Sequence, residues 1–156
     1  MMDPKTYDVI IVGGAVMGSS LAYHLLAMEP RMKLAVVERD PTYSRASTTL
    51  SLGGVRIQFS LKENIQISLY AQNLFSRFEE EMAIAGERIF LNFRQEGYLF
   101  LVDPKGRGAA EESLALQKQL GGAAEWWPPG LIREKFPLID ADDFAGGTFE
   151  IGRAHV

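Results

Sequence analysis

The sequence predicts an α/β fold that begins with a parallel pair of strands. Residues 7–12 form a short apolar run that is rich in Val and Ile and ends in glycine, which is typical of a fully buried strand. Residues 16–28 carry apolar side chains at helical spacing, and residues 33–37 form a second apolar run that ends in acid. Strand, glycine turn, helix and strand in this order indicate a βαβ unit with a right-handed crossover.

The glycine turn between the first strand and the helix predicts a dinucleotide-binding site. Amide groups at the start of a helix lack partners and carry partial positive charge, which favours binding of a diphosphate. Gly13 permits the sharp turn out of the strand, and Gly18 permits close packing of the helix on the strand. Glu38, at the end of the second strand, can accept hydrogen bonds from ribose hydroxyl groups. The alternative is a βαβ turn without a ligand, which explains the glycines but requires no acid at position 38.

Position 15 departs from the G-x-G-x-x-G pattern of dinucleotide sites because it holds alanine. The middle glycine of that pattern lets the backbone approach the diphosphate closely, so we expect the Ala15 methyl group to weaken binding without abolishing it. Glu38 disfavours the 2′-phosphate of NADP, although Arg39 could partly compensate. FAD and NAD both carry a free adenosine ribose, so this Rossmann-like unit leaves both cofactors open. The predicted contacts here are Gly13, Gly14, Ala15, Val16, Met17, Gly18, Glu38 and Arg39.

The segment after the second strand separates FAD from NAD. A simple NAD-binding domain would return directly to a third strand, whereas residues 41–60 are rich in small and hydroxyl-bearing side chains. Its glycine pair, Gly53 and Gly54, permits close approach of the backbone to a flat ligand. Ser47, Thr48 and Thr49 carry hydroxyl groups suited to phosphate or flavin. A flexible surface loop is the alternative interpretation.

The order of four segments resembles a known family. The segments are "DVIIVGGAVMGSSLAYHL", "VVERD", "RASTTLSLGGVRIQFS" and "EGYLFLV". Together they are similar to the amino-terminal region of the D-amino-acid oxidase superfamily of FAD-dependent oxidoreductases, over roughly residues 7–149. Within it, the chain looks most like the glycine oxidase, sarcosine oxidase, dimethylglycine dehydrogenase and D-amino-acid dehydrogenase-like flavoproteins.

The resemblance implies the cofactor and the reaction. It places the FAD pyrophosphate over the glycine turn, the ribose on Glu38, and the flavin near two further groups of residues. The reaction implied is hydride transfer to flavin from the carbon beside an amine, giving an imine, with small-molecule amino acids or secondary or tertiary amines as substrates. It identifies neither the catalytic residues nor the electron acceptor. The residues placed near the flavin are Ser47, Thr48, Thr49, Gly53, Gly54, Val55 and Arg56.

Two other functions stay open, an NAD-dependent dehydrogenase and a non-catalytic flavoprotein that acts as an assembly factor.

The composition excludes several kinds of metal and redox site. Because the chain has no Cys, it holds no disulfide, thiolate zinc site or iron–sulfur cluster, and its two His make a histidine-built metal site improbable. With no Cys and no His between His24 and His155, we expect FAD to be bound non-covalently.

Charge and hydropathy argue against polyanionic partners and membrane insertion. The net charge is −4 and like charges form no block, so nothing favours binding to nucleic acid. Residues 9–28 carry no formal charge over a length that could span a bilayer. They contain glycines and polar side chains, and no cluster of Lys or Arg flanks them. We therefore expect a cytoplasmic protein with neither a membrane span nor a signal peptide.

The rest of the chain predicts mixed α and β structure. Apolar spacing predicts helices over residues 61–85 and 109–120 and a helical turn over 131–136. Residues 89–93 and 96–102 are predicted strands that could pair as a hairpin.

Two clusters in this part of the chain allow two interpretations each. Trp126 and Trp127, before two prolines, could line a substrate site, although packing under a proline loop is favoured. Asp140, Asp142 and Asp143 could serve acid–base chemistry or bind a metal, although a solvated loop is favoured.

We predict three regions along the chain. Residues 1–85 would form the first part of an FAD-binding domain and residues 86–149 the beginning of a substrate domain, both incomplete. Such a piece would expose apolar surface and strand edges, be marginally stable and lack activity alone. Residues 150–156, "EIGRAHV", resemble the translation of a common sequencing adapter, so we expect a non-native tail there. An ordinary terminus is the alternative.

Overall fold

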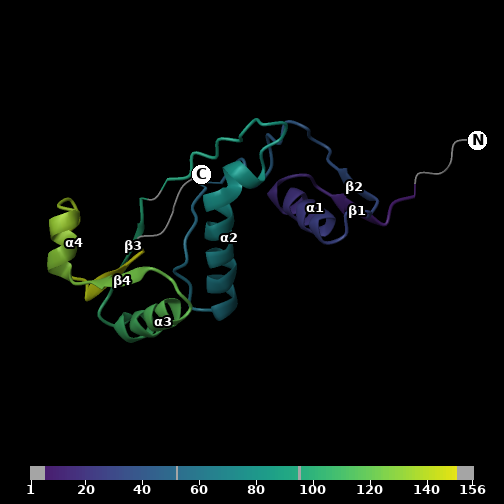
Figure 1. Ribbon diagram of the computed structural model, residues 1–156. Coiled ribbons are helices and arrows are strands. Elements are labelled where there is room, and N and C mark those ends of the chain that lie inside the picture. Colours follow the sequence, from purple (N-terminus) through teal and green to yellow (C-terminus); the bar gives the residue numbers. More distant parts are fainter. Residues whose placement is uncertain (1–5, 52, 95, 151–156) are drawn as a thin grey trace, which may run out of the picture. The chain divides into compact units, whose positions relative to one another are not determined.

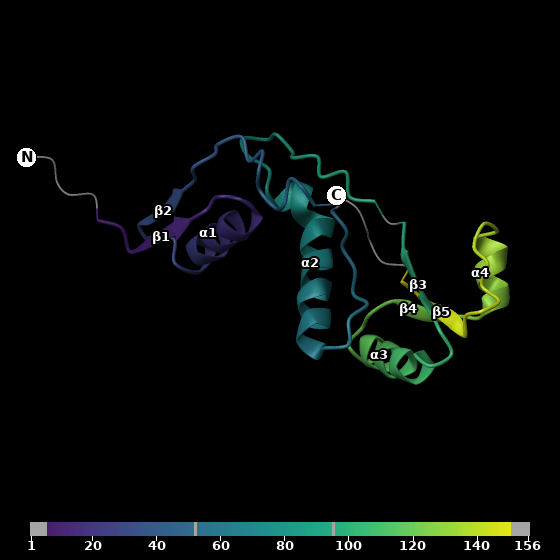
Figure 2. The same ribbon diagram turned by 180° about the vertical axis from the view of Figure 1, so that it is seen from behind.

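The structure is a computed structural model that describes residues 6–51, 53–94 and 96–150. The chain divides into two compact units, with the boundary between residues 52 and 53. Figures 1 and 2 show the elements of both units from opposite sides. In chain order the elements are β1 (Val9–Val12), α1 (Val16–Met28), β2 (Leu34–Val37), α2 (Lys62–Glu81), β3 (Tyr98–Val102), α3 (Arg107–Gln119), β4 (Ala124–Trp127), α4 (Pro129–Lys135) and β5 (Gly146–Glu150).

The first unit is the predicted βαβ arrangement. β1 and β2 pair in parallel, with Val9 opposite Leu34 and Val12 opposite Val37. α1 lies between them in the chain, and its ends agree with the predicted helix. The helix stops at Glu29, immediately before Pro30, because a residue that precedes proline is disfavoured in helical geometry. The prediction of an α/β fold with a parallel strand pair is therefore confirmed.

Apolar side chains of the first unit are widely exposed. No residue of α1 is buried. Val12 is 87% exposed and Met17 is 82% exposed. Within the described part of the chain, β1 and β2 pair only with each other. Parallel strands are usually neighboured and covered on both faces, so the expected exposure of apolar surface and strand edges in this unit is confirmed.

The second unit contains a three-stranded antiparallel sheet in the order β3–β5–β4. Tyr98 of β3 and Ala124 of β4 both pair with Glu150 of β5. α3 contacts β4 and α4 contacts β5, and Figure 2 labels these elements together. The helices predicted over residues 61–85 and 109–120 are present as α2 and α3, with ends shifted by a few residues.

The predicted strand over residues 89–93 and its hairpin are wrong. These residues have no regular secondary structure, and β3 pairs with β5 instead. Asn92 has a φ of 51°, which lies in the left-handed region and interrupts an extended chain. The amide of Leu91 donates to Glu79 Oε1 at 3.2 Å, so this segment is bonded to a side chain of α2 rather than to a strand.

The core of the second unit explains the tryptophan pair. Trp127 belongs to β4 and is buried with Ile132 and Ala141. Its ring stacks on Phe149 with 4.1 Å between ring centroids. The Trp126 ring lies 5.4 Å from the Arg107 guanidinium carbon, in cation–π geometry. For Trp127, the interpretation as a packing residue is confirmed.

The aspartates after α4 lie on the surface. Asp140, Asp142 and Asp143 are exposed, and Asp142 forms an ion pair with Arg133. Within the described residues, no group of three or more His, Cys, Asp or Glu side chains is placed to hold a metal ion. The arrangement agrees with the solvated loop favoured for these residues.

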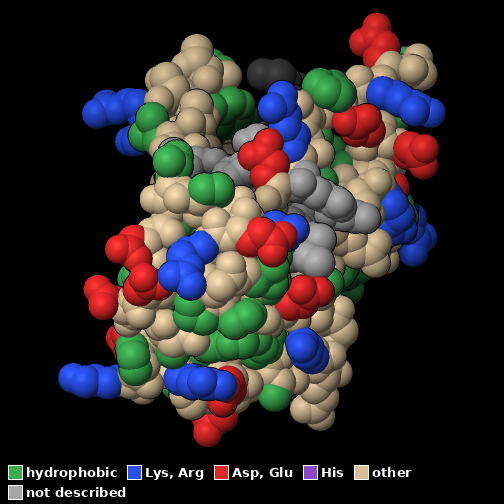
Figure 3. All heavy atoms as spheres, turned by 90° about the vertical axis from the view of Figure 1, so that its left-hand side faces the viewer, with side chains coloured by type: hydrophobic (Ala, Val, Ile, Leu, Met, Phe, Trp, Pro, Cys, Tyr) green, Lys and Arg blue, Asp and Glu red, His purple; other side chains and the backbone are tan. Residues whose placement is uncertain are grey.

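The surface and the end of the described chain bear on the predictions of a membrane span, of polyanionic partners and of a non-native tail. None of the helices in the described ranges has the length and apolar character needed to cross a membrane. On the face shown in Figure 3, acidic and basic side chains are interspersed rather than gathered by sign. Of the predicted tail, residues 151–156 lie outside the described residues, whereas Glu150 is the fully buried last residue of β5. The domain boundary at residue 85 and the tail both stay predictions.

Candidate functional site

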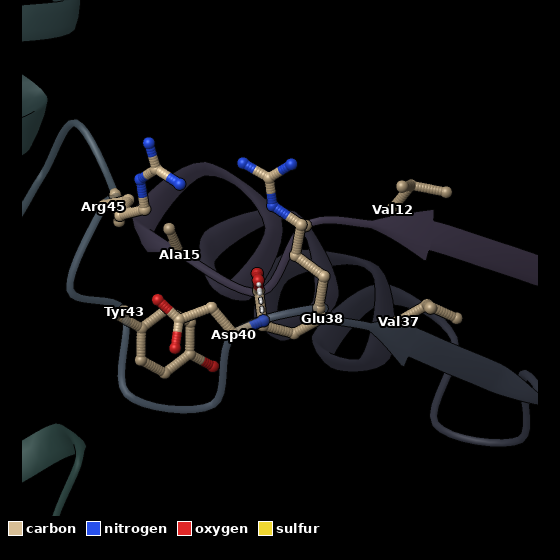
Figure 4. A pocket seen from close by; sticks show the side chains of 10 residues that line it. Val12, Ala15, Val37, Glu38, Asp40, Tyr43 and Arg45 are labelled. Carbon is tan, nitrogen blue, oxygen red and sulfur yellow. Dashed lines mark hydrogen bonds between the residues drawn. The ribbon is translucent and has the colours of Figure 1, made fainter.

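Four of the eight predicted dinucleotide contacts of the first unit, Gly13, Ala15, Glu38 and Arg39, line a pocket of about 440 Å³. The other four, Gly14, Val16, Met17 and Gly18, are not among its lining residues. The pocket lies at the carboxyl ends of β1 and β2, where ligands of parallel sheets characteristically bind. Figure 4 shows side chains from both strand ends and from the following loop facing this space. Its lining residues are Val12, Gly13, Ala15, Val37, Glu38, Arg39, Asp40, Tyr43, Arg45 and Ala46.

Two glycines of the turn have the roles that the sequence predicts for them. Gly13 has a φ of +100°, a conformation that favours glycine, and its amide donates to the carbonyl of Val37 at 2.8 Å. A Cβ atom added at Gly18 would lie 1.8 Å from the Gly13 carbonyl oxygen and 3.2 Å from Ile11 Cγ2. The turn therefore closes only because position 18 lacks a side chain.

The start of α1 is open to an anion. Ala15 is the N-cap residue, its side chain provides no capping hydrogen bond, and the first turn contains no acid. The first intrahelical donor recorded is the amide of Ser19, which donates to the Ala15 carbonyl at 2.9 Å. The amides that precede it, including those of Val16 and Met17, have no intrahelical acceptor. A helix start with these properties attracts negative charge.

Glu38 joins the strand end to the glycine turn. Its Oε2 accepts the Gly14 amide proton at 2.7 Å, and its Oε1 accepts the Asp40 amide proton at 2.9 Å. These two hydrogen bonds, that from Gly14 first, lower the pKa of the Glu38 carboxyl below its ordinary value. Each oxygen keeps further acceptor capacity, so an ionised Glu38 could also accept ribose hydroxyl protons.

The loop after Glu38 is ordered by Asp40, which the sequence interpretation did not include in the site. The Asp40 carboxylate accepts the amide and hydroxyl protons of Thr42 and of Ser44, at distances from 2.6 to 3.1 Å. These bonds, with the Thr42 hydroxyl first, lower the pKa of Asp40 to about 2. The signal for this loop was present in "DPTYS", since Asp followed by hydroxyl residues and proline is typical of side-chain-capped turns.

The sequence interpretation also missed the strand-end residues Val12 and Val37 and the loop residues Tyr43, Arg45 and Ala46 of this pocket. Tyr43 has a φ of 54°, in the left-handed region. Its hydroxyl would lie 2.9 Å from a Cβ atom added at Gly14. The absence of a side chain at Gly14 therefore leaves room for the Tyr43 side chain, and the Gly14 amide bonds to Glu38.

The residues expected near the flavin fall into two places. Ser47, Thr48 and Thr49 are exposed residues of consecutive turns that follow Ala46, and they do not line the first pocket. Gly54, Val55 and Arg56 line a separate pocket of about 450 Å³ in the second unit, while Gly53 has a φ of +68°.

The second pocket surrounds Arg56 with aromatic side chains. The Arg56 guanidinium carbon lies 5.0 Å from the ring centroid of Phe59 and 5.1 Å from that of Phe100. A Cβ atom added at Gly54 would lie 2.1 Å from the Tyr98 hydroxyl oxygen. Gly54 therefore permits close approach, and here the approaching group is a tyrosine.

The chain is similar to proteins of a known family. Residues 8–156 match the family described as "DAO: FAD dependent oxidoreductase". The chain belongs to this family. A relative is "FAD-dependent oxidoreductase domain-containing protein 1" of Xenopus laevis, 44% identical over 152 residues, which cover 95% of this chain and 30% of the relative.

Two solved structures share the fold of the chain. L-proline dehydrogenase from P. horikoshii has a TM-score of 0.79 at 21% identity and matches 99% of this chain and 39% of its own. Glycine oxidase from Geobacillus kaustophilus has a TM-score of 0.72 at 23% identity, over 96% and 40%. The chain thus spans about a third of its Xenopus relative and two fifths of these structures. FAD is the cofactor of the family, which confirms the cofactor predicted from the sequence.

Proposed function

We propose that the pocket at the ends of β1 and β2 binds the adenosine diphosphate part of FAD. The observation that carries the proposal is the Glu38 carboxylate, which lines this pocket and accepts the Gly14 amide proton. This hydrogen bond places Glu38, which is suited to bind ribose, beside the glycine turn, which is suited to bind the diphosphate. In the proposal, residues 13–18 bind the diphosphate and Glu38 accepts protons from the ribose hydroxyl groups.

Two observations support the fit of FAD to these residues. The close contact of Gly18 with the Gly13 carbonyl brings the helix start against the end of β1. The uncapped first turn of α1 leaves amide donors for the diphosphate. The position of Ser47–Thr49 and Gly53–Arg56 near the flavin remains part of the proposal and is supported by the family resemblance.

We further propose that the whole protein oxidises amino acids or secondary or tertiary amines. Support comes from the names of two proteins with the same fold, an L-proline dehydrogenase and a glycine oxidase. When bound, FAD supplies a hydride acceptor. The residues of this chain bind and orient the cofactor, and we assign none of them as acid or base.

The test is reduction of bound flavin in the whole protein encoded by the gene. We expect a yellow protein whose FAD absorbance bleaches without oxygen when an amine or amino acid with a hydrogen on its α-carbon is added. The matched control is an α,α-dimethyl amino acid, which carries no hydrogen there and should leave the flavin oxidised. A flavin that alcohols reduce, and no amine does, would contradict the proposed substrate class.

The same preparation separates the two other hypotheses. A colourless protein that binds NAD would indicate a dehydrogenase of another type. A yellow protein that no amine, amino acid or alcohol reduces would indicate an assembly factor. Both outcomes are read from colour and from flavin reduction, so neither depends on knowing the physiological substrate.

The proposal also covers how FAD is attached and where in the cell the protein is located. Non-covalent attachment is supported by the absence of Cys and by the wide gap between the two His. Acid precipitation of the whole protein should therefore release all of its flavin into the supernatant, and yellow pellets would contradict it. The predicted cytoplasmic location remains part of the proposal and is tested by cell fractionation.

A further inference from the structure

One amide of the glycine turn is already engaged, and a methyl group lies where the pattern has none. The Gly14 amide already donates to Glu38 Oε2 at 2.7 Å. Position 15, where the pattern places its middle glycine, holds Ala15, whose methyl group lines the pocket. A ligand with two negative charges would therefore be bound more tightly if a further cation faced this pocket.

Arg45 is placed to supply it. It lines the same pocket as Ala15, and Figure 4 shows its guanidinium group on the Ala15 side of the pocket. Among the residues that the structure describes, Arg31, Arg77, Arg107 and Arg133 pair with acids, whereas Arg45 enters no ion pair. A guanidinium group fits phosphate oxygens through two parallel N–H bonds.

The charges around the pocket favour a role for this arginine. Glu38 and Asp40 contribute two negative charges to the lining, and Arg39 and Arg45 contribute two positive charges. The low pKa values of both acids keep them ionised at neutral pH. Without Arg45 the lining would carry a net negative charge and would repel the diphosphate.

The loop that carries Arg45 is ordered before a ligand arrives. Asp40 holds Thr42 and Ser44 through four hydrogen bonds. The Asp40 carbonyl accepts the Tyr43 amide proton at 3.0 Å, and the Tyr43 carbonyl accepts the Ala46 amide proton at 3.1 Å. Binding through Arg45 therefore requires little ordering of the backbone, which favours affinity.

We propose that Arg45 binds the diphosphate of the dinucleotide and compensates for alanine at position 15. The inference rests on the proposed FAD site and adds to it a ligand-binding residue outside the glycine turn. It assigns Asp40 a positioning role, since Asp40 contacts the loop and Arg45 contacts the ligand.

The test compares Arg45→Gln with Arg31→Gln, a matched control. Arg31→Gln removes the same charge from an exposed position of the same unit, outside this pocket. FAD and adenosine, which lacks phosphate, are titrated against the flavin-free whole protein encoded by the gene, at low and high salt. We expect Arg45→Gln to weaken FAD binding on the order of tenfold, because a charge-assisted bond is lost. Adenosine binding should not change, and high salt should shrink the FAD effect. Arg31→Gln should bind both ligands as the wild type does.

A double-mutant cycle tests the compensation itself. In a chain that carries Ala15→Gly, the added Arg45→Gln change should weaken FAD binding less than it does in the wild type. Thr42→Val, which removes a hydroxyl bond to Asp40 without changing the charge of the lining, should weaken FAD binding in the wild type and have little further effect in Arg45→Gln.

The remaining outcomes overturn either the proposed function or the role of Arg45. A wild-type whole protein that binds neither FAD nor adenosine overturns the proposed function. FAD binding that is equal in wild type and Arg45→Gln overturns the role of Arg45 alone. An equal loss of FAD and adenosine binding in Arg45→Gln also overturns it, because the arginine would then support the loop rather than the diphosphate.

Discussion

The two units of the chain hold their polar groups in different ways. In the first unit, the bonds of the site are local: Glu38 bonds to Gly14, 24 residues away, and Asp40 bonds within four residues. In the second unit, Glu150 accepts the Ile57 amide proton across 93 residues, at 2.8 Å. The local acids are half-buried, whereas Glu150 is fully buried. A site built from neighbouring residues can be recognised in a sequence, while a distant polar contact cannot.

Burial also gives the acids of the two units opposite titration behaviour. Amide and hydroxyl donors lower the pKa of Glu38 and of Asp40. Burial raises the pKa of Glu150, and the Ile57 amide and the Gln72 side chain offset this only in part. Lowering the pH therefore removes stabilising negative charge from Glu38 and Asp40 in the first unit. In the second unit it neutralises the unfavourable buried charge of Glu150.

The largest expected effect comes from Gly18→Val in the first unit. Because a Cβ atom there would lie 1.8 Å from a backbone oxygen, the turn must open. We expect FAD binding to weaken by about 100-fold or more, as measured by titration. The matched control is Gly108→Ala in α3, where an added Cβ atom meets nothing within 4 Å. Unchanged FAD affinity in Gly18→Val would mean that the diphosphate binds elsewhere.

The next largest difference between the units is expected when apolar side chains are truncated. Ile132 is fully buried in the second unit, and Leu21 of α1 is 50% exposed. We expect Ile132→Ala to lower the free energy of unfolding of its unit by about 2–5 kcal/mol and Leu21→Ala to lower that of the first unit by less than about 1 kcal/mol. Urea unfolding followed by fluorescence of Trp126 and Trp127 reports on the second unit. Similar losses for the two variants would contradict the contrast in packing.

A smaller effect is expected on the pH dependence of the second unit. Since the folded-state pKa of Glu150 lies above its unfolded value of about 4.5, folding takes up a proton. The free energy of unfolding of this unit should therefore gain a stabilising contribution as pH falls from neutral towards 4.5. Glu150→Gln should remove this contribution while its amide keeps partners in Ile57 and a reoriented Gln72. Parallel pH profiles for wild type and variant would contradict the raised pKa.

The opposite sign is expected in the first unit. Because the folded-state pKa of Glu38 is lowered, its contribution is present above about 4.5 and is lost as pH falls through the folded value. Glu38→Gln should flatten this acid limb, which can be followed through the Gly14 amide resonance. An acid limb that persists unchanged in the variant would assign it to other groups.

The smallest effect is expected for Ala15→Gly. The added glycine removes one methyl group beside the diphosphate site, so FAD affinity should rise by a few-fold at most or stay the same. Titration at one salt concentration is sufficient to compare the two chains. A marked loss of affinity would contradict the role assigned to this methyl group.

Sequence patterns predicted the first unit closely for a physical reason. Strand, turn and helix depend there on residues that adjoin one another, and the conformations of Gly13 and Gly18 follow from that order. The ribose-binding role of Glu38 stays a prediction. The capped loop after Glu38 was missed because its bonds come from side chains of ordinary surface residues.

The second unit was harder to predict because its pairings are distant. β5 contains Gly146 and Gly147, which are poor strand formers, and β4 ends directly before two prolines. Both strands form because they pair with each other and β5 pairs with β3. The buried contacts of Glu150 gave no signal in the sequence, since the partners lie on elements far along the chain.

The most direct test of the central claim is an amide NMR titration of the chain with FAD. The account predicts that the largest shifts fall on the amides of residues 13–18, with smaller shifts around Arg45, and that Glu38→Gln reduces all of them. Binding that leaves the amides of residues 13–18 unchanged, or shifts confined to the second unit, would contradict it.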